Sequence, residues 1–176
     1  KEEVDYDFFK SVGELRGLKG ELYEGGVRVP QIAAWPGKIP AGTSSDRVTG
    51  FEDWLPTILE LAGFADSTPG DIDGISLAST LRGEKQDPRP FLYREFPSYG
   101  GQQAVWLGQR WKGIRTELKK KGVKPDLTVQ LYDLEEDLSE SKDVATQHPD
   151  VVKQIEALMK SERVPTEAFP FPALDN

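Results

Sequence analysis

The residues best suited to chemistry lie between residues 17 and 28. Lys19 is flanked by Gly17 and Gly20, a setting in which a loop can present an ammonium group into a cleft. The stretch Glu24-Gly25-Gly26-Val27-Arg28 follows, with two glycines between a carboxylate and a guanidinium. Such glycines allow close backbone approach, and the flanking charges suit a buried ion pair. On residue type alone a loop lysine is ordinarily solvated, so this pattern by itself indicates structure more than catalysis.

Composition excludes most other kinds of site. The chain has no Cys and a single His, which excludes disulfides, a thiolate nucleophile, cysteine metal sites and a multi-histidine metal cluster. The acidic residues from Asp133 to Ser139 alternate as in a calcium loop, but Leu138 and Val144 stand where such a loop needs Gly and Glu. The glycines at 25 and 26 fit neither a dinucleotide-binding nor a phosphate-binding pattern.

Length and charge restrict the class of protein. At 176 residues the chain is long enough for one domain, or for a small domain plus part of another. Its 30 acidic residues against 22 basic ones give a net charge of -8, which argues against a nucleic acid as the main partner. No apolar run approaches the length of about 18 residues that a membrane span requires.

Short strands and one helix are predicted for the first half. Val27, Val29 and the run Ile32 to Trp35 read as short buried strands separated by Pro30. A helix follows, because apolar residues from Phe51 to Ala62 recur at helical spacing on one face. Asp53 is its expected N-cap and Gly63 its C-terminal stop.

The second half has the pattern of an antiparallel sheet with one helix. Strands are expected at 91–96, at 104–107 and 111–115 around the hairpin loop 108–110, and at 129–134. Pro149 opens an amphipathic helix over 149–161. We expect residues 87–162 to form one α+β layer with the helix packed on the sheet, and we place a domain boundary near residue 85.

Several motifs resemble the second half of the type I (formylglycine-dependent) sulfatases. Leu15–Pro30 matches the family's Lys-Gly-x-x-x-Glu-Gly-Gly-x-Arg-x-Pro, and Trp35-Pro-Gly follows as in the family. Asp53-Trp-Leu-Pro-Thr57 and Asp73-Gly-Ile-Ser-Leu77 match two later motifs. Leu131-Tyr-Asp-Leu-Glu-Glu-Asp137 resembles the closing motif, with Leu138 in place of its Pro. The resemblance covers nearly the whole chain, in order.

This resemblance implies the C-terminal portion of an alkaline-phosphatase-like sulfatase that hydrolyses sulfate esters of small molecules or glycans. Residues 1–85 are then the end of the large α/β domain, and residues 86–176 the small antiparallel sheet and helix. We expect the complete enzyme to be secreted or periplasmic and this portion to be inactive alone. The rest of the sulfatase chain, or self-association, is expected to cover apolar surface left exposed in residues 1–85.

The resemblance also implies roles for individual residues. Lys19 matches the lysine that contacts the sulfate group, and Glu24 and Arg28 match positions that hold its loop in place. Independently of the family motifs, the stretch 93–103 with its Tyr-Gly-Gly is expected to approach the substrate, which places Tyr99 and Gln102 near it. The family's nucleophile, a formylglycine made in Cys/Ser-x-Pro-x-Arg, and its calcium ligands have no match here, so both are expected upstream and no metal ligand is assigned to this chain.

Two alternatives remain open from the sequence. A phosphoester or phosphonate hydrolase of the same superfamily shares the metal architecture. A stand-alone module that binds an acidic glycan through Lys119 to Lys121 is the other, although the net charge of -8 counts against it.

Overall fold

The chain forms two compact units, each described here by itself. The structure, a computed structural model, describes residues 6–120, 122 and 124–175. One unit consists of Lys1–Val29 together with Tyr93–Asn176, and the other of Pro30–Leu92. The predicted division at residue 85 concerns the domains of a larger fold and stays a prediction.

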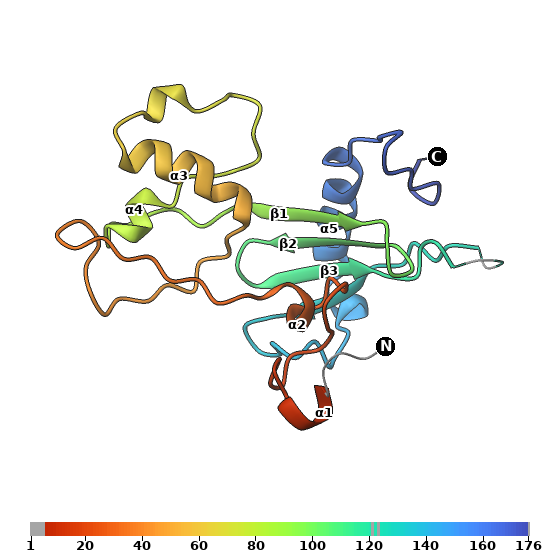
Figure 1. Ribbon diagram of the computed structural model, residues 1–176. Helices are drawn as coiled ribbons and strands as arrows, with labels where there is room; N and C mark the ends of the chain where they lie inside the picture. Colours follow the sequence, from red (N-terminus) through yellow and green to blue (C-terminus); the bar gives the residue numbers. More distant parts are fainter. Residues whose placement is uncertain (1–5, 121, 123, 176) are drawn as a thin grey trace. The chain divides into compact units, whose positions relative to one another are not determined.

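A four-stranded antiparallel sheet is the centre of the first unit (Figure 1). Its strands, β1 (Phe91–Phe96), β2 (Gln102–Leu107), β3 (Trp111–Arg115) and β4 (Gln130–Asp133), lie side by side in chain order. Leu107 pairs with Trp111 at the β2–β3 hairpin, and Trp111 pairs in turn with Asp133 of β4. All four predicted strands and the hairpin loop at 108–110 are present, although β2 begins two residues before the predicted 104 and β4 is one residue shorter at each end than the predicted 129–134.

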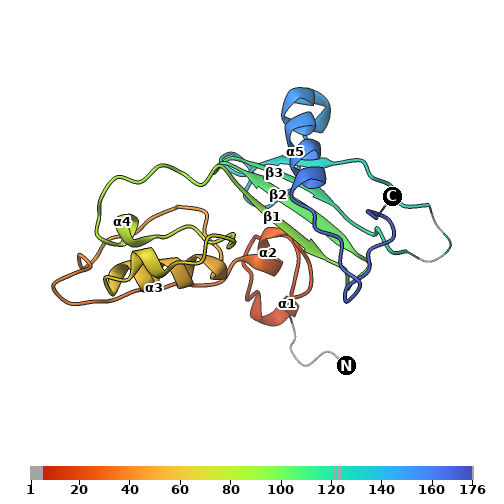
Figure 2. The same cartoon turned by 90° about the horizontal axis from the view of Figure 1, so that it is seen from above.

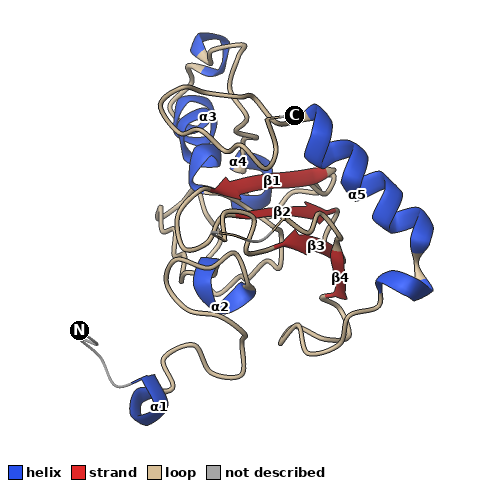
Figure 3. Cartoon of the chain, turned by 90° about the vertical axis from the view of Figure 1, so that its right-hand side faces the viewer, coloured by secondary structure: helices blue, strands red, loops and turns tan. Residues whose placement is uncertain are grey.

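Helix α5 (Pro149–Ser161) packs on one face of this sheet, against β2 and β3 (Figure 3). The short helix η3 (Ala145–Gln147) precedes α5, and Pro149 occupies the first turn of α5. Its buried residues are Ile155 and Met159. A side chain at Gly113 of β3 would lie 2.5 Å from Ile155, so this glycine lets the helix approach closely. The predicted layer of sheet and helix is confirmed.

The opposite face of the sheet carries the segment around α2 (Glu24–Val27) (Figure 2). Residue alternation separates the two faces. Gln103 bonds to the backbone carbonyl of Met159 in α5, whereas Trp106 and Lys112 contact Glu24. Another short helix, α1 (Tyr6–Phe9), precedes this segment.

The short strands predicted between Val27 and Trp35 are wrong. Residues 24–27 form α2, and residues 28–35 have no regular secondary structure. Within the described residues no strand pairs with this stretch, and a strand requires a neighbour to satisfy its backbone groups. Val29, Ile32 and Trp35, which the prediction buries, are exposed.

The second unit is built around η1 (Phe51–Asp53) and α3 (Trp54–Leu61). It also contains η2 (Ala65–Ser67) and α4 (Ala78–Leu81). The predicted helix is present and ends before Gly63, whose N–H donates to the carbonyl of Glu60. Its apolar face is exposed rather than packed within this unit, at Phe51, Leu55 and Ile58. The exposed apolar surface expected in residues 1–85 is therefore present.

Two sulfatase-like motifs meet in this unit. Asp53 forms no cap hydrogen bond to α3, contrary to prediction, because its carboxylate accepts the backbone N–H groups of Gly50 and Ile75 and pairs with Arg89. Thr57 accepts the N–H of Leu77 at 2.8 Å. Asp53 and Thr57 are both buried, and their side chains accept hydrogen bonds from backbone N–H groups. The Asp-x-x-Pro-Thr pattern therefore stabilises the fold of this unit.

Candidate functional site: the Lys19 turn

Lys19 lies at the tip of a tight turn, called here the Lys19 turn and comprising residues 16–23. The N–H of Glu21 donates to the carbonyl of Leu18 at 2.9 Å, and the Glu21 carboxylate accepts the N–H of Leu18 at 2.8 Å. Gly20 has a φ of +95°, which disfavours any other residue there. The Lys19 side chain is exposed, and within the described part of the chain no hydrogen bond or ion pair engages its ammonium.

The paired glycines bring α2 directly against this turn. A Cβ atom at Gly25 would lie 2.4 Å from the carbonyl oxygen of Gly17, and one at Gly26 would lie 2.1 Å from that of Glu21. The N–H of Gly25 also donates to the carbonyl of Arg16 at 2.7 Å. The close backbone approach that the sequence predicts is confirmed, and larger residues are excluded at both positions.

Glu24 anchors α2 to the sheet through a buried network of charges. One of its carboxylate oxygens accepts from the indole N–H of Trp106 at 2.8 Å and from the Lys112 ammonium at 2.9 Å. Glu140 lies 2.7 Å from the same ammonium, and its other oxygen accepts the N–H of Glu24 at 2.6 Å. The Glu24, Lys112 and Glu140 side chains are at most 2% exposed. We call these three residues the buried charge network.

Arg28 completes the charge balance from the surface. Its guanidinium donates to the second oxygen of Glu24 at 2.5 Å, while about half of its side chain stays exposed. The predicted ion pair of Glu24 and Arg28 is therefore present, buried on the glutamate side. Two carboxylates are balanced by two cations, which is the condition for burying such groups.

The two carboxyl groups of the network titrate in opposite directions. Burial acts to raise the pKa of Glu24, but the Lys112 charge and the surrounding donors outweigh it and hold the pKa below its ordinary value of 4.5. Burial dominates at Glu140 and raises the pKa of its carboxyl above 4.5, although Lys112 acts against it. Glu24 thus holds its charge more firmly than Glu140 does.

Tyr99 and Gln102, the predicted substrate residues, both contact the Lys19 turn. The Tyr99 ring stacks on Phe96 and packs against Gly20, where a Cβ would lie 2.8 Å from the ring. Tyr99 is largely exposed. Gln102 is buried, and its amide bonds to the backbone of Gly20 and Leu22. The structure therefore brings Lys19, Glu24, Arg28, Tyr99 and Gln102 into one region.

Sequence reasoning missed three residues that support this region. Arg16 lies over the Tyr23 ring and donates to the Tyr132 hydroxyl, and Lys112 and Glu140 form the buried charge network. Lys112 gives a signal in the sequence, because it occupies an inward position of a strand beside apolar Ile114. Glu140 follows the last strand in an irregular acidic stretch, which gives no such signal.

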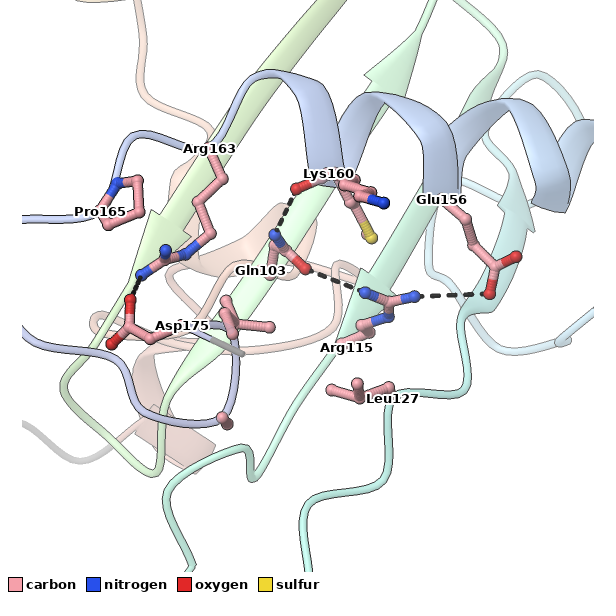
Figure 4. A pocket seen from close by; sticks show the side chains of 11 residues that line it. Gln103, Arg115, Leu127, Glu156, Lys160, Arg163, Pro165 and Asp175 are labelled. Carbon is pink, nitrogen blue, oxygen red and sulfur yellow. Dashed lines mark hydrogen bonds and ion pairs between the residues drawn. The ribbon is translucent and has the colours of Figure 1, made fainter.

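A cavity of about 410 Å³ lies beside α5, on the face of the sheet opposite to α2 (Figure 4). Arg115 and Arg163 both line it. Arg115 pairs with Glu156 at 3.4 Å and Arg163 with Asp175 at 2.7 Å. Both arginines already have carboxylate partners, so they offer an anion less free positive charge than an unpaired cation would, although Lys160 also lines the cavity.

The lysines at 119–121 add no free cation to the candidate region within the described residues, and no metal site is found there either. The Lys119 ammonium donates to the carbonyl of Pro170 and Lys120 pairs with Glu117, whereas Lys121 lies outside the described residues. Within residues 6–120, 122 and 124–175 no three His, Asp or Glu side chains gather as metal ligands do, so these residues do not fit a calcium site. No helix in the same part of the chain is long and apolar enough to cross a membrane.

Comparison with known proteins places this arrangement in a family. Residues 18–165 match the model of the family described as N-sulphoglucosamine sulphohydrolase, C-terminal. A sulfatase from Formosa agariphila is 34% identical over 144 residues, which are 77% of this chain and 26% of that protein. N-acetylgalactosamine-6-sulfatase from Canis lupus familiaris is 41% identical over 93 residues, covering 52% of this chain and 17% of that protein.

A solved structure supports the same relationship. It comes from work on the metabolism of multiple glycosaminoglycans by Bacteroides thetaiotaomicron, and it is 28% identical with a TM-score of 0.66. The match covers 90% of this chain and 35% of that one. The chain thus spans about a third or less of the relatives that it matches. It belongs to the sulfatase family, within the alkaline-phosphatase superfamily, and corresponds to the C-terminal region of those enzymes.

Proposed function

We propose that this chain is the C-terminal part of a sulfuric ester hydrolase and that Lys19 is its sulfate-contacting residue. The observation that carries the proposal is an ammonium that is exposed and unpaired within the described residues, on a turn fixed by hydrogen bonds on both sides. Family membership and the Lys-Gly-x-x-x-Glu-Gly-Gly match support the same role.

The chemistry asks for a fixed cation at this position. Negative charge on the sulfuryl oxygens must be stabilised while the ester oxygen leaves, and an ammonium held in place does so without reorganisation. Glu24 and Arg28 contribute indirectly, because their ion pair fixes the helix that the turn packs against. Sulfatases use calcium and a formylglycine in their N-terminal catalytic domain, and no step through either is assigned to the residues of this chain.

Sulfated glycans are the substrate class that the relatives favour. One relative is named for N-acetylgalactosamine 6-sulfate, and the solved structure comes from work on glycosaminoglycans. Hydrolysis of a phosphate or phosphonate ester would also require a fixed cation at Lys19 to stabilise negative charge. A complete enzyme should therefore be assayed with matched sulfate and phosphate esters. A glycan-binding module acting through Lys119 and Lys120 is disfavoured, because both side chains already have partners within the chain.

Steady-state kinetics of Lys19→Ala in the complete enzyme tests the proposal. Loss of one preorganised charged contact is expected to lower kcat on the order of 10²–10³-fold. Lys19→Arg should restore little, because a planar guanidinium does not replace a compact ammonium. Lys153→Ala is the matched control, since Lys153 is an exposed lysine on α5. An unchanged kcat/KM for Lys19→Ala would remove the proposed role.

The 176-residue chain by itself is expected to hydrolyse no sulfate ester above background, with or without calcium. Its sequence contains no Cys and no Ser-x-Pro-x-Arg from which the family's nucleophile is made. Calcium-dependent turnover of an aryl sulfate by this chain would show that the active site is misplaced. We also propose that the complete enzyme is secreted or periplasmic, and that its remaining part covers the exposed apolar residues of α3.

A further inference from the structure

Gln102 uses both polar atoms of its side chain on the backbone of the Lys19 turn. Its oxygen accepts the N–H of Leu22 at 2.9 Å, and its nitrogen donates to the carbonyl of Gly20 at 2.9 Å. The residue is 3% exposed, so water does not substitute readily for either partner. The two bonds hold the residues that directly follow Lys19.

The side chain is itself rigidly placed. Gln102 is the first residue of β2, and the preceding Gly101 accepts the N–H of Leu118 at 3.1 Å. The buried ring of Phe171 packs against Gly101, where a Cβ would lie 2.8 Å from it. Gln102 therefore transmits the position of the sheet to the turn.

A primary amide offers an acceptor and a donor side by side in one plane without a change of protonation state. A carboxylate of the same length would keep the bond from Leu22 but set an oxygen against the carbonyl of Gly20. A thioether of the same length would lose both bonds while filling nearly the same volume. The chemistry of the site therefore specifies Gln at this position.

We propose that Gln102 is a positioning residue for Lys19, acting through the backbone of Gly20 and Leu22 rather than by touching substrate. This inference rests on the proposed function, in which Lys19 contacts the sulfate group. It replaces the expected substrate contact of Gln102 by an indirect role, because the buried amide is fully engaged with the protein backbone. Of the two residues expected near the substrate, Tyr99, which packs against Gly20, is the exposed one.

The neighbouring residue provides a matched control. Gln103 is equally buried, but it points to the other face of β2, where it donates to the carbonyl of Met159 in α5. Gln102→Met and Gln103→Met each remove one buried amide from the same strand. We expect similar losses of thermal stability from the two substitutions, and we expect only Gln102→Met to affect Lys19.

The decisive experiment is a double-mutant cycle in the complete enzyme. Gln102→Met should lower kcat/KM on the order of 10–100-fold, since small displacements of a catalytic group have effects of this size. Gln103→Met should stay within about twofold of the parent. In a Lys19→Ala background, Gln102→Met should have almost no further effect, because the group that it positions is absent.

Several outcomes would overturn the inference. It is wrong if Gln102→Met behaves like Gln103→Met, or if its effect persists undiminished in the Lys19→Ala background. If Gln102→Met fails to fold, Gln102→Leu serves in its place, because it also removes both hydrogen bonds, and a kcat/KM within about twofold of the parent would again contradict the inference.

Hydrogen exchange on the 176-residue chain separates the two proposals. The Leu22 amide should be protected in the parent and in Gln103→Met, and exposed to exchange in Gln102→Met. Slow exchange in all three would refute the contact between Gln102 and the turn. If exchange behaves as expected but Lys19→Ala has normal kinetics, the proposed function fails while the contact stands.

Discussion

The Glu140 carboxylate accepts the backbone N–H of Glu24 at 2.6 Å, across 116 residues of sequence. The same carboxylate pairs with Lys112, which also pairs with the Glu24 side chain. A single residue after the last strand thus supports both the backbone and the charge of the helix beside the Lys19 turn. The geometry of that turn depends on a buried charge network of which the sequence motifs contain only Glu24.

Removing the central cation of the buried charge network should strongly destabilise the chain. Lys112→Met leaves two buried carboxylates without their shared partner, and we expect the free energy of unfolding to fall by about 3–5 kcal/mol. Lys120→Met, at an exposed lysine, should change it by less than about 0.5 kcal/mol. Urea unfolding of both variants measures the difference. Equal effects would show that the network contributes little.

The raised pKa of Glu140 makes a prediction for the dependence of stability on pH. Because its pKa lies above the ordinary 4.5, the native state holds a proton that the unfolded chain has lost, so its contribution to stability falls as pH rises above 4.5. Glu140→Gln removes this loss. Relative to the parent, the variant should become progressively more stable as the pH rises above 4.5. Urea unfolding across that range tests it, and a trend of opposite sign would contradict the assignment.

Gly26→Ala tests the close approach of α2 to the Lys19 turn. The added Cβ would lie 2.1 Å from the carbonyl oxygen of Glu21, so the backbone must move. We expect the free energy of unfolding to fall by about 1–3 kcal/mol. Each kcal/mol lost should lower Tm by about 2–4 °C. Gly70→Ala is the control, because its Cβ meets nothing within 4 Å. Scanning calorimetry that finds the two variants alike would refute the steric argument.

The exposed apolar face of α3 predicts that the isolated chain self-associates. Phe51, Leu55 and Ile58 are all at least half exposed and are spaced to share one helix face. Sedimentation velocity should show mass increasing with concentration, and Leu55→Glu combined with Ile58→Glu should reduce it. Leu138→Glu, at an exposed leucine outside α3, is the control. A monomer at every concentration would contradict the prediction.

Elements with local signals could be predicted from the sequence. The β2–β3 hairpin follows from the three-residue loop between two β-like segments, and α5 follows from Pro149 and a helical period. The segment from Val27 to Trp35 has the composition of strands but no partner in the described chain, and composition does not reveal whether a partner exists. Asp53 is predicted to cap α3, but its carboxylate accepts the N–H of Ile75 instead. Ile75 lies 22 residues further along the chain, so a local sequence pattern does not reveal this partner.

Part of the candidate site could not be predicted from the sequence, because it is formed by residues that lie far apart in the chain. The Lys-Gly-x-x-x-Glu-Gly-Gly motif identifies Lys19 and Glu24, because their spacing is local. Lys112 and Glu140 join them only after the sheet has formed, 88 and 116 residues further along the chain from Glu24. Gln102 lies two residues before the predicted strand 104–107, whereas β2 begins at Gln102, so the prediction assigned this side chain to neither face of the sheet.

The long separation between the turn and its supports has a consequence for biosynthesis. At a synthesis rate of about 5–20 residues per second, roughly 6–23 s elapse between the emergence of Glu24 and that of Glu140. Lys112 emerges earlier, 88 residues after Glu24, so the acceptor for the Glu24 N–H is the later of the two partners to appear. The segment that contains Glu140 therefore decides when the newly made chain completes the support of the Lys19 turn, and termination before Glu140 would leave α2 without that support even though the turn's own sequence is complete.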